Sequence, residues 1–257
     1  MKAIWTGAIG FGLVNIPIKL YSAVHGSELD LDMLDKTDQA NIRFKRVNEN
    51  TGKEVTWDNI VRGYKIDEKY VILTDEDFKK ASPEKTKVIE IAEFINETDI
   101  DSIYYDTPYY LEPEKSGGKA YALLRDALAK TKKAALGTFV MRNREDLCII
   151  KPSQNILVLN KIRFQQEIRS TEELNVPSAQ AKPAEIKMAI QLIDSLSGKF
   201  DIGKYKDTYS DELMKLIQAK AKGKKPATPQ MKVVHSNAKD LMSQLKASLQ
   251  KNTKKAS

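Results

Sequence analysis

The chain has 257 residues, with 42 lysines and arginines against 35 aspartates and glutamates, and a net charge of +7. Its single cysteine, Cys148, excludes an intramolecular disulfide and a thiolate-only zinc site, and it suits a reducing compartment. The sequence shows neither a secretory leader nor an apolar run long enough to span a membrane, so we expect a soluble intracellular protein with no membrane partner.

The basic character belongs to the end of the chain. Residues 215–257 contain eleven lysines and one acidic residue, Asp240, whereas the preceding residues are slightly acidic overall. A lysine-rich tail without aromatic residues is typical of a segment that meets a polyanion without reading its sequence. A solubilising tail with no partner is the alternative that composition leaves open.

In chain order, the first predicted elements are two strands within residues 4–23. Several apolar residues occupy strand-type positions and are expected to be buried: Phe11, Leu13, Ile16, Ile18 and Leu20. Glycines among them indicate bulges or tight corners of a curved sheet. Pro17 has no N–H donor, which predicts a sheet edge or a kink. The segment therefore predicts the opening of a β-barrel.

Strand patterns dominate the first two thirds of the chain. Residues 42–57 predict a hairpin that carries basic residues, with its turn at residues 48–52. Thr74 is expected to cap a short helix, and Gly118 leads into an amphipathic helix. Further strands are expected at residues 64–74, 88–95, 102–111, 134–141, 147–150 and 155–164.

Helical patterns replace strands after Val176. Residues 177–183 indicate a linker, and Pro183 suits the first turn of a helix that ends at Gly198. A second helix is expected from near Ser210 to Gly223. A possible third helix has leucines at four-residue spacing: Leu241, Leu245 and Leu249. Such short amphipathic helices bury little alone, so we expect them to dock on the barrel or on a partner.

The predicted fold is mainly β with helices, in the α+β class. Residues 1–182 are expected to form a β-barrel core with a hairpin arm. Residues 183–222 are expected to form a small helical segment, and residues 223–257 a lysine-rich, flexible tail. An arm built from extended hairpins exposes apolar faces that one barrel cannot cover, which predicts an obligate homodimer.

A search for reactive groups gives little. The two histidines, His25 and His235, are far apart in sequence, and no phosphate-binding loop is present. The Asp67-Glu68-Lys69 triplet is similar to part of a nuclease motif but is expected by chance in so charged a chain. Three aspartates are candidate magnesium ligands, and the alternative is that they belong to a solvated loop: Asp99, Asp101 and Asp106. We therefore predict no catalytic residue, no metal and no cofactor.

The run GLVNIPIKLYSA, residues 12–23, resembles the opening of the bacterial Ku proteins, and similarity continues along most of the chain. These are homodimeric DNA end-binding factors of non-homologous end joining, the repair of double-strand breaks. The resemblance implies a Ku-type barrel and arm, with two chains interlocked into a ring around double-stranded DNA near its end. Phosphate contacts carry no sequence information, so such a ring is indifferent to sequence. The implied location is the cytoplasm, in association with the bacterial nucleoid.

The resemblance also implies a set of phosphate contacts in the arm and at one barrel hairpin: Arg43, Lys45, Arg46, Lys53, Arg62, Lys65, Arg142 and Arg144. The basic tail adds three more candidate contacts: Lys222, Lys224 and Lys225. A solvated surface charge is the alternative for each of them. Residues 184–222 would recruit the ATP-dependent, multifunctional DNA ligase of the pathway, with intramolecular docking as the alternative.

Two departures from the family pattern stand out. Some relatives carry Cys-x-x-Cys in the arm where this chain has Asn48 and Thr51, so a zinc ion is not expected there. Thr6 and Gly10 occupy positions where many relatives have lysine and serine, so contacts of the family at these two positions are not carried over to this chain.

Two other functions remain open from the residues alone. The first is a sequence-nonspecific architectural protein that coats or compacts DNA through its tail, with the barrel as a dimerisation scaffold. The second, a nuclease, has less support because no metal or nucleophile constellation is present. A comparison of linear with circular DNA distinguishes end binding from coating.

Overall fold

The computed structural model describes residues 1–81, 87–142, 144–178, 180–224, 245 and 248. The chain divides into two compact units. The first contains residues 1–26 and 31–170, and the second contains residues 27–30 and 171–257. A short piece that precedes the arm in sequence therefore belongs to the C-terminal unit.

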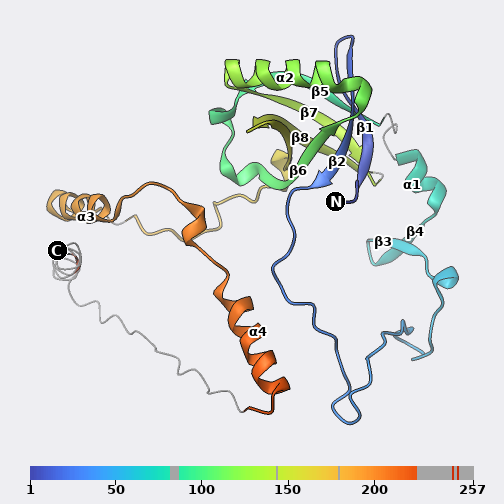
Figure 1. Cartoon of the computed structure of the whole chain (residues 1–257). Coiled ribbons are helices and arrows are strands. Elements are labelled where there is room, and N and C mark those ends of the chain that lie inside the picture. Colours follow the sequence, from blue (N-terminus) through green and yellow to red (C-terminus); the bar gives the residue numbers. More distant parts are fainter. Residues whose placement is uncertain (82–86, 143, 179, 225–244, 246–247, 249–257) are drawn as a thin grey trace. The chain divides into compact units, whose positions relative to one another are not determined.

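Seven strands of the first unit close into a barrel in the order β1-β2-β6-β9-β8-β7-β5 (Figure 1). Neighbouring strands are antiparallel except β1 and β5, whose short parallel pairing closes the barrel. Closure leaves no sheet edge to be protected. The strands are β1 (Trp5–Phe11), β2 (Val14–Ser22), β5 (Val88–Asn96), β6 (Tyr105–Pro113), β7 (Lys133–Met141), β8 (Arg144–Ser153) and β9 (Ile156–Ile162).

Strand β2 shows why the opening segment folds as it does. Ile16, Ile18 and Leu20 alternate with less buried residues and are completely buried, which confirms the predicted strand periodicity. Leu13, predicted to be buried, is instead fully exposed at the tip of the β1–β2 hairpin. The chain reverses direction at this tip through Gly12, whose φ of +54° lies in the left-handed region that favours glycine.

Pro17 lies inside the closed barrel, paired with Ala8 of β1, so the predicted sheet edge is wrong. The proline is tolerated because the ladder between β2 and β6 begins only at the next residue, Ile18. The carbonyl of Pro17 accepts a hydrogen bond from the N–H of Glu114 at 2.9 Å. The missing donor therefore falls at the end of the β2–β6 ladder, beyond its last strand pair.

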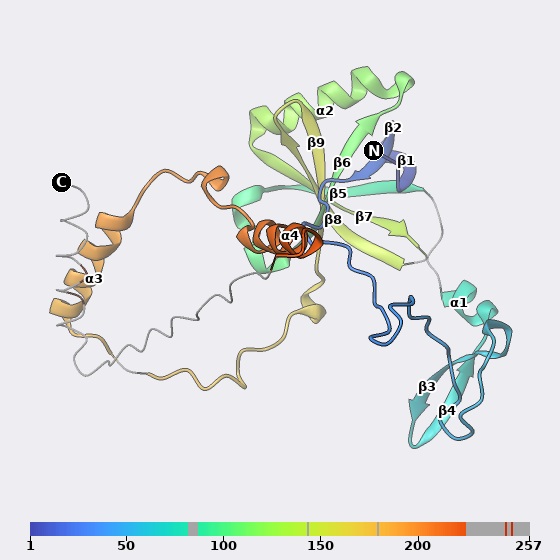
Figure 2. The same cartoon turned by 60° about the horizontal axis from the view of Figure 1, so that its bottom comes forward.

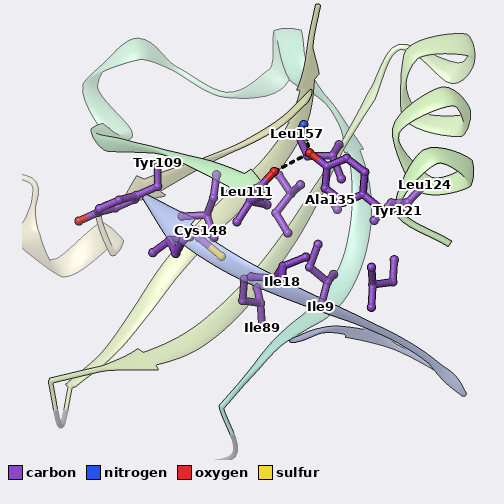
Figure 3. Packing of buried hydrophobic residues seen from close by; sticks show 14 of the residues in the cluster. Ile9, Ile18, Ile89, Tyr109, Leu111, Tyr121, Leu124, Ala135, Cys148 and Leu157 are labelled. Atoms are coloured by element: carbon purple, nitrogen blue, oxygen red, sulfur yellow. Dashed lines mark hydrogen bonds between the residues drawn. The ribbon is translucent and has the colours of Figure 1, made fainter. Parts of the chain in front are cut away.

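Helix α2 (Gly118–Thr131) packs on the barrel through Tyr121, Leu124 and Leu128, all of them buried (Figure 1). The Tyr121 hydroxyl donates to the carbonyl of Leu111 at 2.6 Å and accepts from the N–H of Leu157 at 2.7 Å (Figure 3). One phenol therefore ties the helix to β6 and β9. Cys148 is buried in the same cluster, as predicted, and burial raises the pKa of its thiol.

Tyr121→Phe is expected to destabilise the barrel by about 1–3 kcal/mol, because it leaves a buried carbonyl and a buried N–H without partners. Urea unfolding followed by circular dichroism measures the change. Tyr110→Phe is the matched control, since Tyr110 is exposed on β6. Equal stability of the Tyr121→Phe variant and the wild type would show that these two hydrogen bonds contribute nothing to the free energy of unfolding.

Residues 31–81, called the arm below, contain β3 (Arg62–Ile66), β4 (Lys69–Leu73) and α1 (Asp75–Ala81). Among the described residues, these two strands pair only with each other. Thr74 caps α1, as predicted: its hydroxyl accepts from the N–H of Asp77, whose carboxylate accepts from the N–H of Thr74. The hydrogen bonds to Thr74 lower the pKa of Asp77. No residue of the arm is buried.

The predicted hairpin over residues 42–57 is only partly present. Its turn at residues 48–52 forms, but the flanking segments make one isolated bridge, between Val47 and Glu54, rather than two regular strands. Short 3-10 helices occur along the chain: η1 (Trp57–Asn59), η2 (Glu97–Asp99), η3 (Ser102–Tyr104), η4 (Lys115–Gly117), η5 (Gln165–Glu167) and η6 (Ile202–Lys204).

The C-terminal unit contains α3 (Pro183–Leu196) and α4 (Thr208–Ala221), drawn in orange in Figure 2. Helix α3 begins at Pro183, as predicted. Helix α4 begins two residues before the predicted Ser210, because the side chain of Asp207 accepts from the N–H groups of Tyr209 and Ser210. Neither helix has a buried residue. The predicted third helix has Leu241 and Leu249 outside the described residues.

Candidate nucleic-acid interface

The arm presents six predicted phosphate contacts on an extended, solvent-exposed backbone. All six side chains are exposed. They occupy the loop before η1 and strand β3 of the two-stranded sheet: Arg43, Lys45, Arg46, Lys53, Arg62 and Lys65. A basic, exposed segment of this kind suits contact with a polyanion, since its charges are already accessible on the surface.

Two of these arginines are held by aromatic rings that the sequence analysis did not single out. The guanidinium carbon of Arg46 lies 3.7 Å from the centroid of Trp57, and that of Arg62 lies 4.1 Å from the centroid of Phe78. Such stacking restricts the guanidinium and leaves its edge, which carries the N–H groups, turned toward oxygen acceptors such as Asp75, which lies 3.4 Å from Arg62. An aromatic residue eleven or sixteen positions after an arginine is too distant a signal to have been found from sequence.

Three of the basic side chains form ion pairs inside the arm. Lys45 lies 2.7 Å from Glu54, Arg62 lies 3.4 Å from Asp75, and Lys65 lies 2.6 Å from Glu68. All three pairs are exposed to solvent. Exposed pairs of this kind contribute about 0–1 kcal/mol, so a phosphate can displace the carboxylate at small cost. Arg43 and Lys53 make no ion pair in the part of the chain that the structure describes.

Side-chain oxygens organise the turn at residues 48–52. The Oδ1 atom of Asn48 accepts from the N–H groups of Asn50 and Thr51, both at 3.0 Å. The N–H of Asn48 donates to the carbonyl of Lys53, and the N–H of Gly52 donates to the carbonyl of Asn48. The turn is therefore closed by ordinary hydrogen bonds, without a thiolate.

A second turn, at residues 35–40, repeats this arrangement. Asp35 Oδ1 accepts from the N–H of Thr37. The N–H of Asp35 donates to the carbonyl of Ala40, and the N–H of Gln39 donates to the carbonyl of Asp35, which matches the two backbone bonds of the Asn48 turn. Gln39 has a φ of +61° where Gly52 has +66°. Among the described residues, no group of three or more His, Cys, Asp or Glu side chains is arranged to hold a metal ion.

The carboxylates considered as magnesium ligands are engaged separately. Asp101 caps η3 by accepting from the N–H of Ile103, and Asp106 lies 3.6 Å from Arg163. Asp67 and Glu68 form the β3–β4 turn, both with positive φ. This arrangement gives no support to a nuclease site.

The remaining predicted contacts lie elsewhere. Arg142 and Arg144 flank the β7–β8 turn; Arg142 is exposed with a φ of +52°, and Arg144 lies 3.2 Å from Glu167. Lys222 is the C-cap of α4, and Lys224 follows it. Lys225 and most of the predicted tail lie outside the described residues. The structure thus groups the six arm residues along one segment, and the others belong to separate parts of the fold.

Large apolar side chains accompany the basic residues of the arm. Phe44 is 79% exposed and Trp57 is 68% exposed. The two-stranded sheet exposes apolar groups on both faces: Tyr64, Ile66, Tyr70, Val71 and Ile72. An isolated two-stranded sheet is marginally stable in water, and patches of this extent mark an interaction surface. The arm of a single chain is thus incomplete as a folded element.

Comparisons with known proteins agree on one family. The family model described as the Ku70/Ku80 beta-barrel domain matches residues 10–188. The chain is 39% identical to the non-homologous end joining protein Ku of Coxiella burnetii, with 98% of this chain and 96% of that protein covered. The corresponding proteins of Bacillus subtilis and Archaeoglobus fulgidus are 39% and 38% identical, each over 97% of this chain and over 82% and 99% of their own lengths.

Among solved structures, the SPOC domain of human PHD-finger protein 3 matches with a TM-score of 0.31 and 12% identity. The match covers 63% of this chain and 97% of that domain. No helix among the described residues is long and apolar enough to cross a membrane.

Proposed function

Since the chain belongs to the Ku family, we propose that it binds double-stranded DNA ends as a homodimeric ring, independently of sequence, in non-homologous end joining. The observation that carries the proposal is the arm, which combines exposed basic side chains with exposed apolar ones and buries no residue of its own. Charge suits it to DNA, and the apolar surface suits it to a second copy of the chain.

The apolar surface of the arm supports the homodimer. Both faces of the β3–β4 sheet expose large side chains, so a single partner on one face leaves the other uncovered. Two arms that interlock cover each other and give each sheet the additional layer that a stable sheet requires. An interface built this way is obligate, because the separated arms lack a core of their own.

The basic residues of the arm support sequence-independent contact. Arg46 and Arg62 are stacked on aromatic rings, and Lys45 and Lys65 carry exposed partners that a phosphate can replace. Phosphates position a protein on the duplex without identifying bases. The preference for ends comes from topology, since a closed ring can be loaded only where the duplex stops. No catalytic group, cofactor or metal is required for this function.

The C-terminal unit supports recruitment of a protein partner. Helix α3 exposes a row of isoleucines at helical spacing: Ile186, Ile190 and Ile193. We assign to α3 and α4 the recruitment of the ATP-dependent, multifunctional DNA ligase of end joining. The proposed location is the cytoplasm, at the nucleoid.

A chain that ends at Lys222 distinguishes this function from DNA coating through the tail. The deletion removes eight lysines and Asp240. We expect weaker and less salt-dependent binding, because fewer counterions are released, with an unchanged preference for linear over relaxed circular DNA of one sequence. Filter binding at several salt concentrations measures both quantities. Loss of the preference on truncation would show that the tail, rather than a ring, finds the break, and would favour an architectural protein.

A further inference from the structure

An apolar groove of 570 Å³ lies between helix α2 and the first hairpin of the barrel. Phe11 and Val14 form one wall, Phe94 of β5 contributes from the barrel, and α2 forms the other wall. The rings of Phe11 and Phe94 meet edge to face, with centroids 6.0 Å apart. The groove is therefore built on a rigid part of the fold rather than on the arm or the C-terminal unit.

Helix α2 exposes a leucine to this groove. Leu124 and Leu128 are buried in the barrel core, but Leu123 is 72% exposed although it lines the groove with them. Leu13, at the tip of the adjoining hairpin, is fully exposed. Neither side chain belongs to the buried core cluster, and an exposed apolar groove marks a site of interaction.

The charges around the groove indicate its occupant. Lys133 lines the groove, and Lys130 and Lys132 precede it at the end of α2. The acidic residue of α2, Asp126, is already paired with Arg125 at 2.8 Å. Glu90 lies in a neighbouring hollow around Gly12 and not among the residues that line the groove. A ligand that fits must be apolar along its length and acidic at the lysine end.

We propose that this groove binds an amphipathic helix of a partner protein, with apolar anchors on one face and acidic residues over Lys130, Lys132 and Lys133. The groove runs beside a helix of 14 residues, so a partner helix of similar length can lie along it. Leu123 and the Phe11–Phe94 pair contact the apolar anchors of the partner helix, and the lysines favour a partner with acidic residues at that end. This surface shares no residue with the arm or with α3 and α4, and it adds a third protein-binding surface to the molecule.

The probe is a fluorescein-labelled helical peptide of about four turns, with leucines along one face, glutamates at one end and uncharged polar residues elsewhere. A second peptide carries lysines in place of the glutamates. Fluorescence anisotropy with the full chain is expected to show preference for the acidic peptide. Leu123→Asp should weaken its binding at least about tenfold, as loss of a central apolar anchor does. The control Ala129→Asp adds the same charge to an exposed position of α2 that does not line the groove and should leave binding unchanged.

The charge selection is tested separately. The double variant Lys130→Glu with Lys133→Glu should reverse the preference toward the lysine-bearing peptide. Equal binding of the two peptides by the wild type, or undiminished binding by Leu123→Asp, would overturn the proposal. A change of oligomeric state in Leu123→Asp, measured by sedimentation, would also overturn it by showing that a second copy fills the groove. DNA-end binding by Leu123→Asp is expected to stay at the wild-type level, so this test fails or succeeds independently of the proposed ring.

Discussion

Replacing Arg43, Lys45 and Arg46 together by glutamine is expected to lower the slope of log affinity against log salt concentration by about 0.9 for each lost phosphate contact. The loss is therefore up to about 2.7 per chain, and twice that in a homodimer. Glutamine keeps the length and polarity of each side chain roughly intact while it removes the charge. The affinity should fall equally for AT-rich and GC-rich duplexes, because phosphates are alike in both. Fluorescence titrations at several salt concentrations measure the slope.

The matched control removes the same number of charges from the barrel. Lys115, Lys119 and Lys130 are exposed on or beside α2, and their replacement by glutamine changes the net charge equally. The control should leave the slope close to that of the wild type. A folded, dimeric arm variant with an unchanged slope would place the three residues in solvent and move the DNA path elsewhere.

Tyr64→Asp combined with Val71→Asp is expected to convert the homodimer into monomers. The two residues are direct partners across the β3–β4 pair and lie on one face of it. Two carboxylates in a covered apolar surface must lose their hydration, and each such burial costs several kcal/mol. Sedimentation velocity at micromolar concentration should show a dimer for the wild type and a monomer for the variant, and end binding should be lost with the dimer.

Asn50→Asp serves as the control for this variant. It adds a negative charge to the arm at an exposed turn whose backbone hydrogen bonds do not involve the Asn50 side chain. The control should remain dimeric. A wild-type chain that sediments as a monomer at every concentration would contradict the ring, whatever the variants do.

The barrel was predictable because its strands obey a local rule. Burial of every second residue in β2 follows from the alternation of Ile16, Ile18 and Leu20, which is visible in the sequence. The exposure of Leu13 was not predictable in the same way. It depends on the residue at which the hairpin reverses, and one glycine among several adopts the positive φ that the turn requires. The error at Leu13 therefore lies at an element boundary.

The candidate interface was less accessible to sequence reasoning. The positions of basic residues such as Arg46 follow from the resemblance, but their partners do not. Trp57 and Glu54 reach the basic segment only after the chain has turned back at Asn48. Arg144 meets Glu167 across 23 residues and an intervening strand. No periodic pattern links such pairs, so the electrostatic environment of each contact could be determined only from the folded structure.

The shared hydrogen-bond pattern of the turns at Asp35 and Asn48 was also hidden. The two segments have different residues at most positions, and what they share is backbone geometry. A zinc ion was not expected at this turn because Asn48 and Thr51 occupy the positions that cysteines would need to hold. The structure adds the physical reason that the Asn48 turn stands without one: an amide oxygen accepts two N–H groups.

The ring itself is tested most directly by trapping it on DNA. The protein is loaded on a linear duplex with biotin at both ends, streptavidin then blocks the ends, and the complex is challenged with high salt and excess competitor DNA. Screening removes the phosphate contacts, so only a topological link can hold the protein. We expect retention when the ends are blocked after loading, release when they stay open, and no loading when they are blocked first. Equal release in all three cases would contradict a closed ring around the duplex.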